Sequence, residues 1–60
     1  MHYILLEKSS GLYVCSVNSK VLYPDFARKF NSVEKAKLFL SEARYDKNKY
    51  EIIQRDDYRR

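Results

Sequence analysis

The apolar residues near the N-terminus form a continuous run, and in an extended chain their side chains alternate between the two faces. Over residues 2–8, Ile4 and Leu6 fall on one face of an extended strand, while Tyr3 and Leu5 fall on the other. A period of two is typical of a β-strand, and here neither face is polar throughout. We therefore expect a strand whose two faces both need cover.

A turn and a second run of β-forming residues complete a predicted hairpin. Gly11 can adopt the positive φ that closes a three-residue loop at 9–11, and residues 12–17 then form the second strand. This loop places Leu6 opposite Val14, whereas a loop of two or four residues would swap the faces of the second strand. With the three-residue loop, one face of the hairpin carries Tyr3, Leu5, Tyr13, Cys15 and Val17.

The middle of the chain carries the signals of a short strand and a turn. Residues 20–23 predict a third strand that stops at Pro24, because proline has no N–H to donate to a ladder. Residues 24–27 suit a single helical turn with Pro24 at its start. We expect Phe26 and Phe30 to fill one end of the core.

An amphipathic helix follows. Asn31, with Glu34 three residues later, has the spacing of a capping box and predicts a helix from there to about Tyr45. Residues three and four apart form its predicted core side, which comprises Val33, Ala36, Phe39, Leu40 and Ala43.

Residues 49–55 predict a closing strand, and residues 56–60 a frayed tail. Together the elements predict a single α+β domain over residues 1–60, with a small, mainly antiparallel sheet in the order β-β-short β-α-β and the helix packed on one face. A core of this size is small, so we expect stability to depend on good packing or on association.

One helix covers only one face of a sheet, whereas the predicted hairpin is apolar on both. Apolar side chains that adjoin on the uncovered face would form an interaction site. The alternative is the ordinary apolar surface that every protein exposes. We expect the uncovered face to bind another protein through Tyr3, Leu5, Tyr13, Val17 and Ile53.

A smaller apolar stripe is predicted on the outer side of the helix. Leu38 and Tyr45 are seven residues apart and align there, roughly opposite the core side. They would form a second contact with a partner or with another copy of the chain. The alternative is that Leu38 is a single exposed leucine and that Tyr45 packs on the loop that follows.

The residues that enzymes and metal sites need are scarce. One cysteine, Cys15, and one histidine, His2, exclude an internal disulfide and a four-ligand zinc site. The carboxylates lack the spacing of metal or acid–base sites, and Gly11, the only glycine, excludes a glycine-rich phosphate loop. We expect no catalytic residues, no cofactor and no metal, and therefore a protein that is not an enzyme.

The net charge of +4 leaves nucleic acid as an alternative partner. The excess is mild and acidic residues lie between the basic ones, so an ordinary solvated surface is the simpler interpretation. If nucleic acid binds, tyrosines would stack on bases beside basic side chains. The residues expected for this role are Tyr50, Lys49, Arg55, Arg28 and Lys29.

The sequence favours a cytoplasmic protein without a membrane partner. No apolar run approaches the ~20 residues of a membrane-spanning helix. The N-terminus lacks the basic-then-apolar pattern of a signal peptide, and a lone thiol suits a reducing compartment.

The start of the predicted helix and the last predicted strand resemble segments of a known group of proteins. Residues 27–40, Ala-Arg-Lys-Phe-Asn-Ser-Val-Glu-Lys-Ala-Lys-Leu-Phe-Leu, followed by residues 49–53, Lys-Tyr-Glu-Ile-Ile, are similar to small accessory proteins of tailed bacteriophages. Such proteins often combine a leading hairpin, a helix entry of this type and a closing strand, and they frequently act in host takeover. The resemblance implies that the protein acts in the host cytoplasm as an inhibitor, and that its target is a host defence system, a host toxin or a host polymerase. It assigns no site residue.

These observations lead to one functional hypothesis with a variant. We expect a small non-enzymatic module that binds another protein and inhibits or modulates it. In the variant, the same surface joins two copies of the chain into a homodimer.

Overall fold

Seven elements follow one another in residues 1–56, the part of the chain that the computed structural model describes. In chain order they are β1 (His2–Glu7), β2 (Tyr13–Ser16), β3 (Ser19–Val21), η1 (Pro24–Phe26), α1 (Val33–Glu42), η2 (Lys47–Lys49) and β4 (Tyr50–Arg55), where η marks a 3₁₀ turn. Of the predicted tail at 56–60, all but Asp56 lies outside the described residues. Asp56 follows β4 without regular structure.

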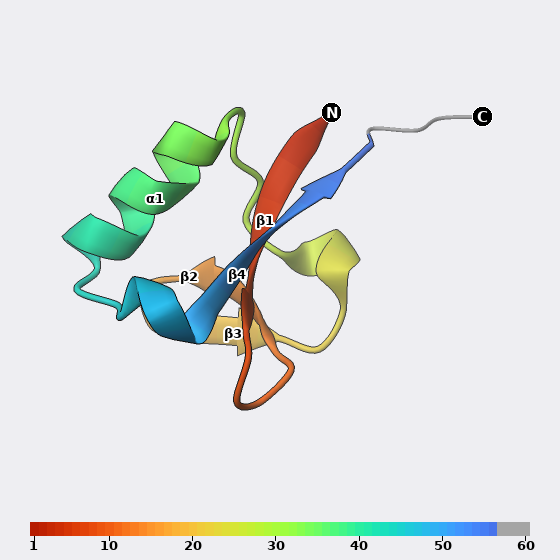
Figure 1. The fold of residues 1–60 in the computed structure, drawn as a ribbon. Helices are drawn as coiled ribbons and strands as arrows, with labels where there is room; N and C mark the ends of the chain where they lie inside the picture. Colours follow the sequence, from red (N-terminus) through yellow and green to blue (C-terminus); the bar gives the residue numbers. More distant parts are fainter. Residues whose placement is uncertain (57–60) are drawn as a thin grey trace.

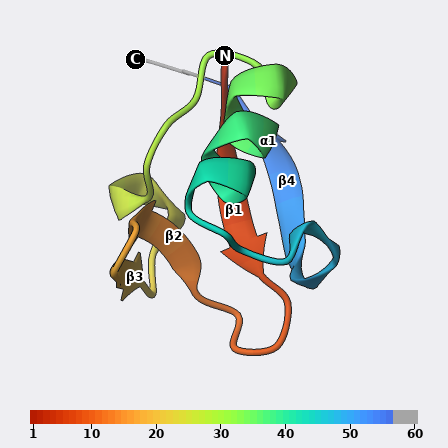
Figure 2. The ribbon, with the colours of Figure 1, turned by 90° about the vertical axis from the view of Figure 1, so that its left-hand side faces the viewer.

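The strands form an antiparallel sheet in the order β3-β2-β1-β4. Helix α1 lies against one side of this sheet, and η1 lies on the opposite side (Figure 1). Seen after a quarter turn, β1 is at the centre and β4 forms an edge (Figure 2). The predicted α+β class, the order of the elements and the helix on one face are confirmed.

The loop of the first hairpin is one residue longer than predicted. The Glu7 N–H donates to the Leu12 carbonyl at 2.8 Å, and the Gly11 N–H donates to the Glu7 carbonyl at 2.9 Å. The loop therefore comprises residues 8–11, and Gly11 closes it with a φ of 75°.

This extra loop residue reverses the faces of β2. Leu6 pairs with Tyr13 rather than with Val14. Because successive side chains on a strand point to opposite faces, the shift moves Val14 to the side of Leu5 and turns Tyr13 away from it. The predicted composition of the two hairpin faces is therefore wrong.

The segment before α1 inserts between β1 and β2. Phe30 and Tyr3 form an isolated antiparallel bridge in which each N–H donates to the other carbonyl at 2.9 Å. Two residues earlier, the Arg28 N–H donates to the Val14 carbonyl at 2.9 Å. Strands β1 and β2 pair directly beside the hairpin loop. The inserted segment supplies hydrogen bonds where the two strands diverge.

The main core lies between the sheet and α1. Its buried residues are Leu5, Val14, Phe30, Ala36, Leu40 and Tyr50, with Tyr3, Phe39, Tyr45 and Ile52 packed against them. Phe30 fills the core as predicted. Phe26 does not, because η1 carries it to the other side of the sheet, where 67% of its surface is exposed.

Helix α1 begins later and ends earlier than predicted. Ser32, not Asn31, is the N-cap: its backbone is extended, and its side-chain oxygen accepts the Lys35 N–H at 3.2 Å. Glu34 then lies in the first turn, where a carboxylate interacts favourably with the helix dipole.

The C-terminal end of α1 is closed by Arg44 in the left-handed conformation, with a φ of 62°. The N–H of Tyr45 donates to the Leu40 carbonyl at 2.9 Å, and the N–H of Arg44 donates to the Ser41 carbonyl at 3.1 Å. This pair of bonds is the pattern of a Schellman motif. The helix therefore stops before Tyr45, which belongs to the connection that follows.

The chain covers part of its second sheet face itself. Ile4 points away from α1 and is nevertheless 0% exposed, and Ala27, directly after η1, is 5% exposed. On that side of the sheet lie η1 and the residues that flank it (Figure 1). The expectation that the face without the helix is left open is therefore wrong at its centre. The face with Tyr3 and Leu5, which was expected to stay open, is the one that α1 covers.

Candidate functional site

The predicted protein-binding residues do not form one surface. Leu5 is fully buried beneath α1, and Tyr3 packs against the same core. Tyr13 and Ile53 lie half-buried on the opposite side of the sheet, and Val17 is 50% exposed in the turn before β3. Helix α1 covers the face that holds Tyr3 and Leu5. The one-residue shift of β2 turns Tyr13 to the other face, where Ile53 also lies because it pairs with Ile4.

The predicted stripe on the outer side of the helix is also divided. Leu38 is exposed on α1. Tyr45 packs inward: its ring contacts the rings of Phe39 and Tyr50, and its hydroxyl donates to the Val17 carbonyl. Of the two interpretations, the structure supports the one in which Tyr45 packs on neighbouring chain and Leu38 is a single exposed leucine.

Residues 1–56 contain no group of three His, Cys, Asp or Glu side chains placed to hold a metal ion. Cys15 is a free, half-buried thiol on β2. Nor does this part of the chain include a helix with the length and apolar content needed to cross a membrane.

Large apolar side chains gather instead around η1. Leu22, Tyr23 and Phe26 are 69%, 62% and 67% exposed, although they lie within five consecutive residues. The Tyr23 and Phe26 rings meet edge to face with centroids 6.3 Å apart. We call these three residues the apolar patch.

The backbone beneath the apolar patch is held in place. The Phe26 N–H donates to the Tyr23 carbonyl and the Ala27 N–H to the Pro24 carbonyl, both at 3.1 Å. Asp25, between the two exposed aromatic rings in sequence, lies 3.8 Å from the Arg55 guanidinium on β4. The patch is therefore presented on a hydrogen-bonded turn rather than on a free loop.

Sequence reasoning located this turn but assigned its side chains wrongly. Pro24, after the strand predicted at residues 20–23, indicates a turn over residues 24–27. The strand ends at Val21 instead, so Leu22 and Tyr23 lie outside it. Several large apolar residues beside a turn indicate that some of them are exposed, because turns lie on the protein surface. Phe26 was instead expected in the core.

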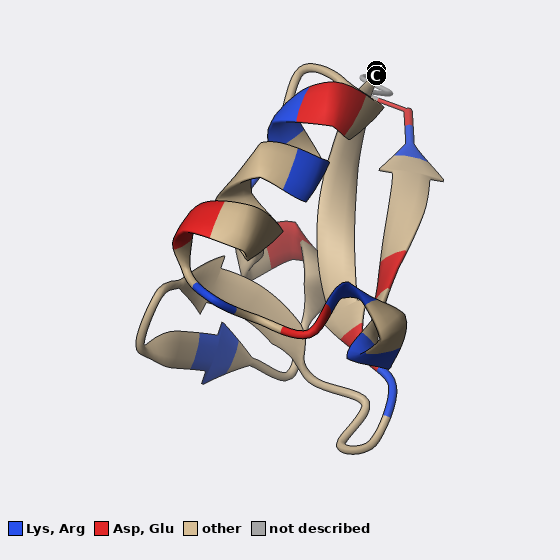
Figure 3. Cartoon of the chain, turned by 60° about the vertical axis from the view of Figure 1, so that its left-hand side comes forward, with Lys and Arg blue, Asp and Glu red and all other residues tan. Residues whose placement is uncertain are grey.

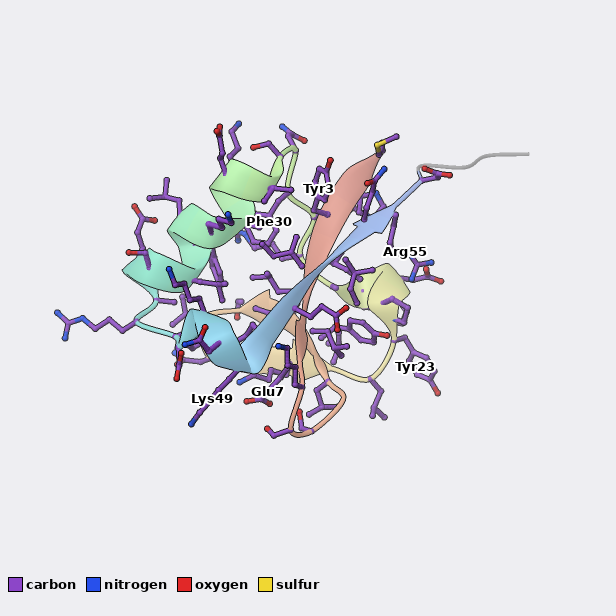
Figure 4. All side chains as sticks on the ribbon, in the orientation of Figure 1. Tyr3, Glu7, Tyr23, Phe30, Lys49 and Arg55 are labelled. Carbon is purple, nitrogen blue, oxygen red and sulfur yellow. The ribbon has the colours of Figure 1, made fainter. Side chains whose placement is uncertain are left out.

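Charged residues lie largely on α1, around η2 and near the ends of β1 and β4, with one basic position on β3 (Figure 3). Of the residues predicted for nucleic acid, Tyr50 is 9% exposed and stacks on Tyr45, so its ring is not available to a base. Arg55 lies on the same side of the sheet as Tyr23, whereas Tyr3 and Phe30 lie on the α1 side (Figure 4). Lys49 is exposed in η2.

Arg28 and Lys29 do line a groove beside α1. It measures about 320 Å³, and its lining comprises Arg28, Lys29, Phe30, Asn31, Lys35, Leu38, Phe39 and Glu42. The Arg28 guanidinium lies over the Phe30 and Phe39 rings, 5.6 and 5.2 Å from their centroids. We call this the basic groove. It brings together two of the five predicted residues and adds Lys35.

A polar cluster surrounds Glu7 at the end of β1. The Ser10 hydroxyl donates to the Glu7 carboxylate at 2.6 Å, and Tyr50 lies 3.4 Å from its other oxygen. The Ser10 hydrogen bond, helped by the positive charge of Lys20, lowers the pKa of Glu7 below 4.5. Burial raises the pKa of Tyr50 above 10.0. These groups fasten the hairpin loop to β4, and no reactive geometry accompanies them.

Comparisons with protein-family models, curated proteins and solved structures found no match. The functional argument therefore rests on the geometry of the apolar patch and the basic groove.

Proposed function

We propose that the protein is a small, non-enzymatic binding module that docks on another protein through the apolar patch and inhibits or modulates it by occupying its surface. The observation that carries this proposal is the pair Tyr23 and Phe26, which are 62% and 67% exposed and in mutual contact. Exposed apolar groups that adjoin mark interaction sites more often than scattered ones do.

Energetics support the choice of this surface. Burying the exposed two-thirds of an aromatic ring contributes about 1–2 kcal/mol before the cost of association. Tyrosine is enriched among the residues that dominate binding energy. Because hydrogen bonds already order η1, docking loses little backbone entropy, which leaves more of that energy for affinity.

The pull-down that tests this proposal compares three forms of the full chain. The wild type, the double variant Tyr23→Ser/Phe26→Ser and the control Leu38→Ser are immobilised and exposed to lysate of the cells in which the protein is made. Leu38 is a suitable control because it is 56% exposed and lies on α1, across the sheet from η1.

We expect a partner that the wild type and Leu38→Ser retain equally and that the double variant retains about tenfold less, which corresponds to ~1.4 kcal/mol of lost binding energy. Equal retention of every captured protein by all three forms would contradict docking through the apolar patch. Circular dichroism checks that the double variant remains folded.

Nucleic-acid binding at the basic groove is a second candidate. The observation that favours it is the convergence of Arg28, Lys29 and Lys35 around one hollow. Contacts to phosphates release counterions, so such binding weakens steeply with salt. A titration of the protein with fluorescent single-stranded DNA and RNA at rising salt tests it, and Lys29→Glu/Lys35→Glu is the matched variant. Absence of binding at low salt removes this candidate.

A further inference from the structure

We propose that the free edge of β4 pairs with the same edge of a second copy, antiparallel, with Ile53 on the twofold axis. This edge contains none of the three residues of the apolar patch, although Arg55 also lies near Asp25 of η1. The dimer and the docking surface are measured separately, so the two proposals can fail independently. The argument rests on the hydrogen-bonding groups of β4, on the contrast with the other edge strand, and on the charges along β4.

The register of β4 shows which of its backbone groups are free. The Lys8 N–H donates to the Lys49 carbonyl at 3.0 Å, and each β4 residue pairs in step with β1 up to Arg55 with His2. Hydrogen-bonded and non-hydrogen-bonded residue pairs alternate along an antiparallel ladder. Because Lys8 and Lys49 are a hydrogen-bonded pair, every second residue after Lys49 also directs its backbone N–H and C=O towards β1; these are Glu51, Ile53 and Arg55.

The intervening residues direct theirs away from the sheet. These are Tyr50, Ile52 and Gln54. The Tyr50 N–H is used, because it donates to the Lys47 carbonyl at the end of η2. Within residues 1–56, the outward N–H and C=O groups of Ile52 and Gln54 make no backbone hydrogen bond and are available to another strand.

The two edges of the sheet differ in how far they are protected against such pairing. β3 is three residues long, a register irregularity interrupts its ladder with β2, and Pro24 follows soon after. Short, irregular edges of this kind resist the addition of a strand. β4 is six residues long and its register with β1 is regular throughout. It is the edge that remains open.

The charges along β4 select one register. With Ile53 opposite Ile53 of the other copy, Ile52 lies opposite Gln54 of the other copy. The free N–H and C=O groups of these two residues can then hydrogen-bond to each other. Glu51 then lies opposite Arg55 of the other copy, and Arg55 opposite its Glu51. Figure 3 shows the acidic position near the start of β4 and the basic position at its end. Opposite charges directly across an antiparallel pair stabilise it.

Each neighbouring register fails at least one of these two conditions. Centred on Gln54, the free backbone groups would still meet, but Ile53 rather than Glu51 would lie opposite Arg55. Centred on Ile52, the pairing would need the Tyr50 N–H, which is already bonded, and would set Glu51 against Ile53. Centred on Glu51, it would oppose two carboxylates. The Arg55 guanidinium is free enough for the proposed contact, because it lies 3.8 Å from Asp25 and leaves donors unused.

A charge exchange across this edge tests both the pairing and its register. Glu51→Arg places two cations opposite each other at both ends of the pairing, and Arg55→Glu places two anions there. Each variant alone should dimerise about tenfold more weakly than the wild type or worse, because two attractions become two repulsions. Mixed in equal amounts, the two variants have complementary edges and should form a heterodimer. Sedimentation velocity over a wide range of concentration measures the dimerisation of the wild type, of each variant and of the mixture.

Amide hydrogen exchange of the wild type gives an independent test. In the dimer, the amides of Ile52 and Gln54 should become protected as the concentration rises, while those of Tyr23 and Phe26 should not. A strict monomer at the highest concentration, a dimer whose new protection lies elsewhere, or single variants that dimerise like the wild type would each overturn the proposal. Circular dichroism identifies a variant that does not fold. In that case the hydrogen exchange of the wild type decides whether β4 forms the dimer contact.

Discussion

The ring of Tyr45 stacks on the ring of Tyr50 with centroids 5.0 Å apart and planes inclined by 7°. This contact joins the connection after α1 to the first residue of β4. The Lys20 ammonium lies 5.3 Å from the centroid of the Tyr45 ring, so β3 is tied to the same point. Tyr45, which one of the two sequence interpretations placed on an outer stripe, thus packs against the core.

The stacked pair predicts unequal effects for Tyr45 and Leu38. Tyr45→Ala should lower the free energy of unfolding by about 2–3 kcal/mol, because a packed ring and its cavity are lost together. Leu38→Ala should change it by less than about 0.5 kcal/mol, because Leu38 is 56% exposed. Urea unfolding followed by circular dichroism measures both. Equal losses would show that the two residues do share one packed stripe.

The end of α1 predicts a stabilising substitution. Arg44 has a φ of 62°, a conformation that glycine adopts at little steric cost and other residues do not. Arg44→Gly should therefore raise the free energy of unfolding by about 0.5–1 kcal/mol. Arg44→Ala is the control, since it removes the same charge but keeps the steric cost. A gain that appears equally in both variants would belong to the charge and not to the backbone. Thermal unfolding compares them.

The polar cluster at Glu7 predicts a dependence of stability on acid. Its folded-state pKa is lowered below 4.5, chiefly by the Ser10 hydrogen bond, so the ionised carboxylate stabilises the folded state. This contribution is fully present above about pH 4.5 and is lost as the pH falls through the folded-state pKa.

Glu7→Gln should therefore flatten the fall in unfolding free energy below pH 4.5, and Ser10→Ala should move the carboxyl pKa back up towards 4.5. Urea unfolding at a series of pH values measures the first effect, and an NMR titration of the Glu7 carboxyl measures the second. Glu34→Gln on α1 is the control for the loss of one acidic charge. An unchanged slope in Glu7→Gln would contradict a stabilising role for the cluster.

The apolar patch should be separable from the stability of the fold. Phe26→Ser should change the free energy of unfolding by less than about 0.5 kcal/mol, because two-thirds of the ring lies in solvent. Leu5→Ala should cost about 3 kcal/mol, because Leu5 is fully buried beneath α1. Chemical unfolding of the two variants decides whether Phe26 is a surface residue and Leu5 a core residue. A large loss in Phe26→Ser would point to a packing role for the patch.

The architecture could be read from the sequence because several local signals agree. The alternation around Ile4, the turn at Gly11, the proline at position 24 and the periodic run of α1 each indicate one element, and their lengths fit a helix lying along a small sheet. Periodicity identifies element types well, because it reflects which side chains must be buried.

The two faces of the sheet could not be read in the same way, because the side on which each β2 residue lies depends on the length of the hairpin loop to within one residue. The sequence is compatible with a loop at 9–11 or at 8–11, and only the longer loop puts Val14 beneath α1 beside Leu5. The return of residues 22–27 over the second face is a long-range contact, and no local pattern reports it. The outward positions of Tyr23 and Phe26 follow from that return.

Because of the bridge between Tyr3 and Phe30, β1 is hydrogen-bonded to three segments from different parts of the chain: β2, the residues before α1, and β4. No contiguous half of residues 1–56 can complete the ladder of this strand, because β4 follows the other elements described in the chain. Folding is then expected to be all-or-none, because each loop must be closed before its contacts contribute. The amides of β1 should exchange only through opening of the whole molecule, which leaves a protease no partly folded form to attack.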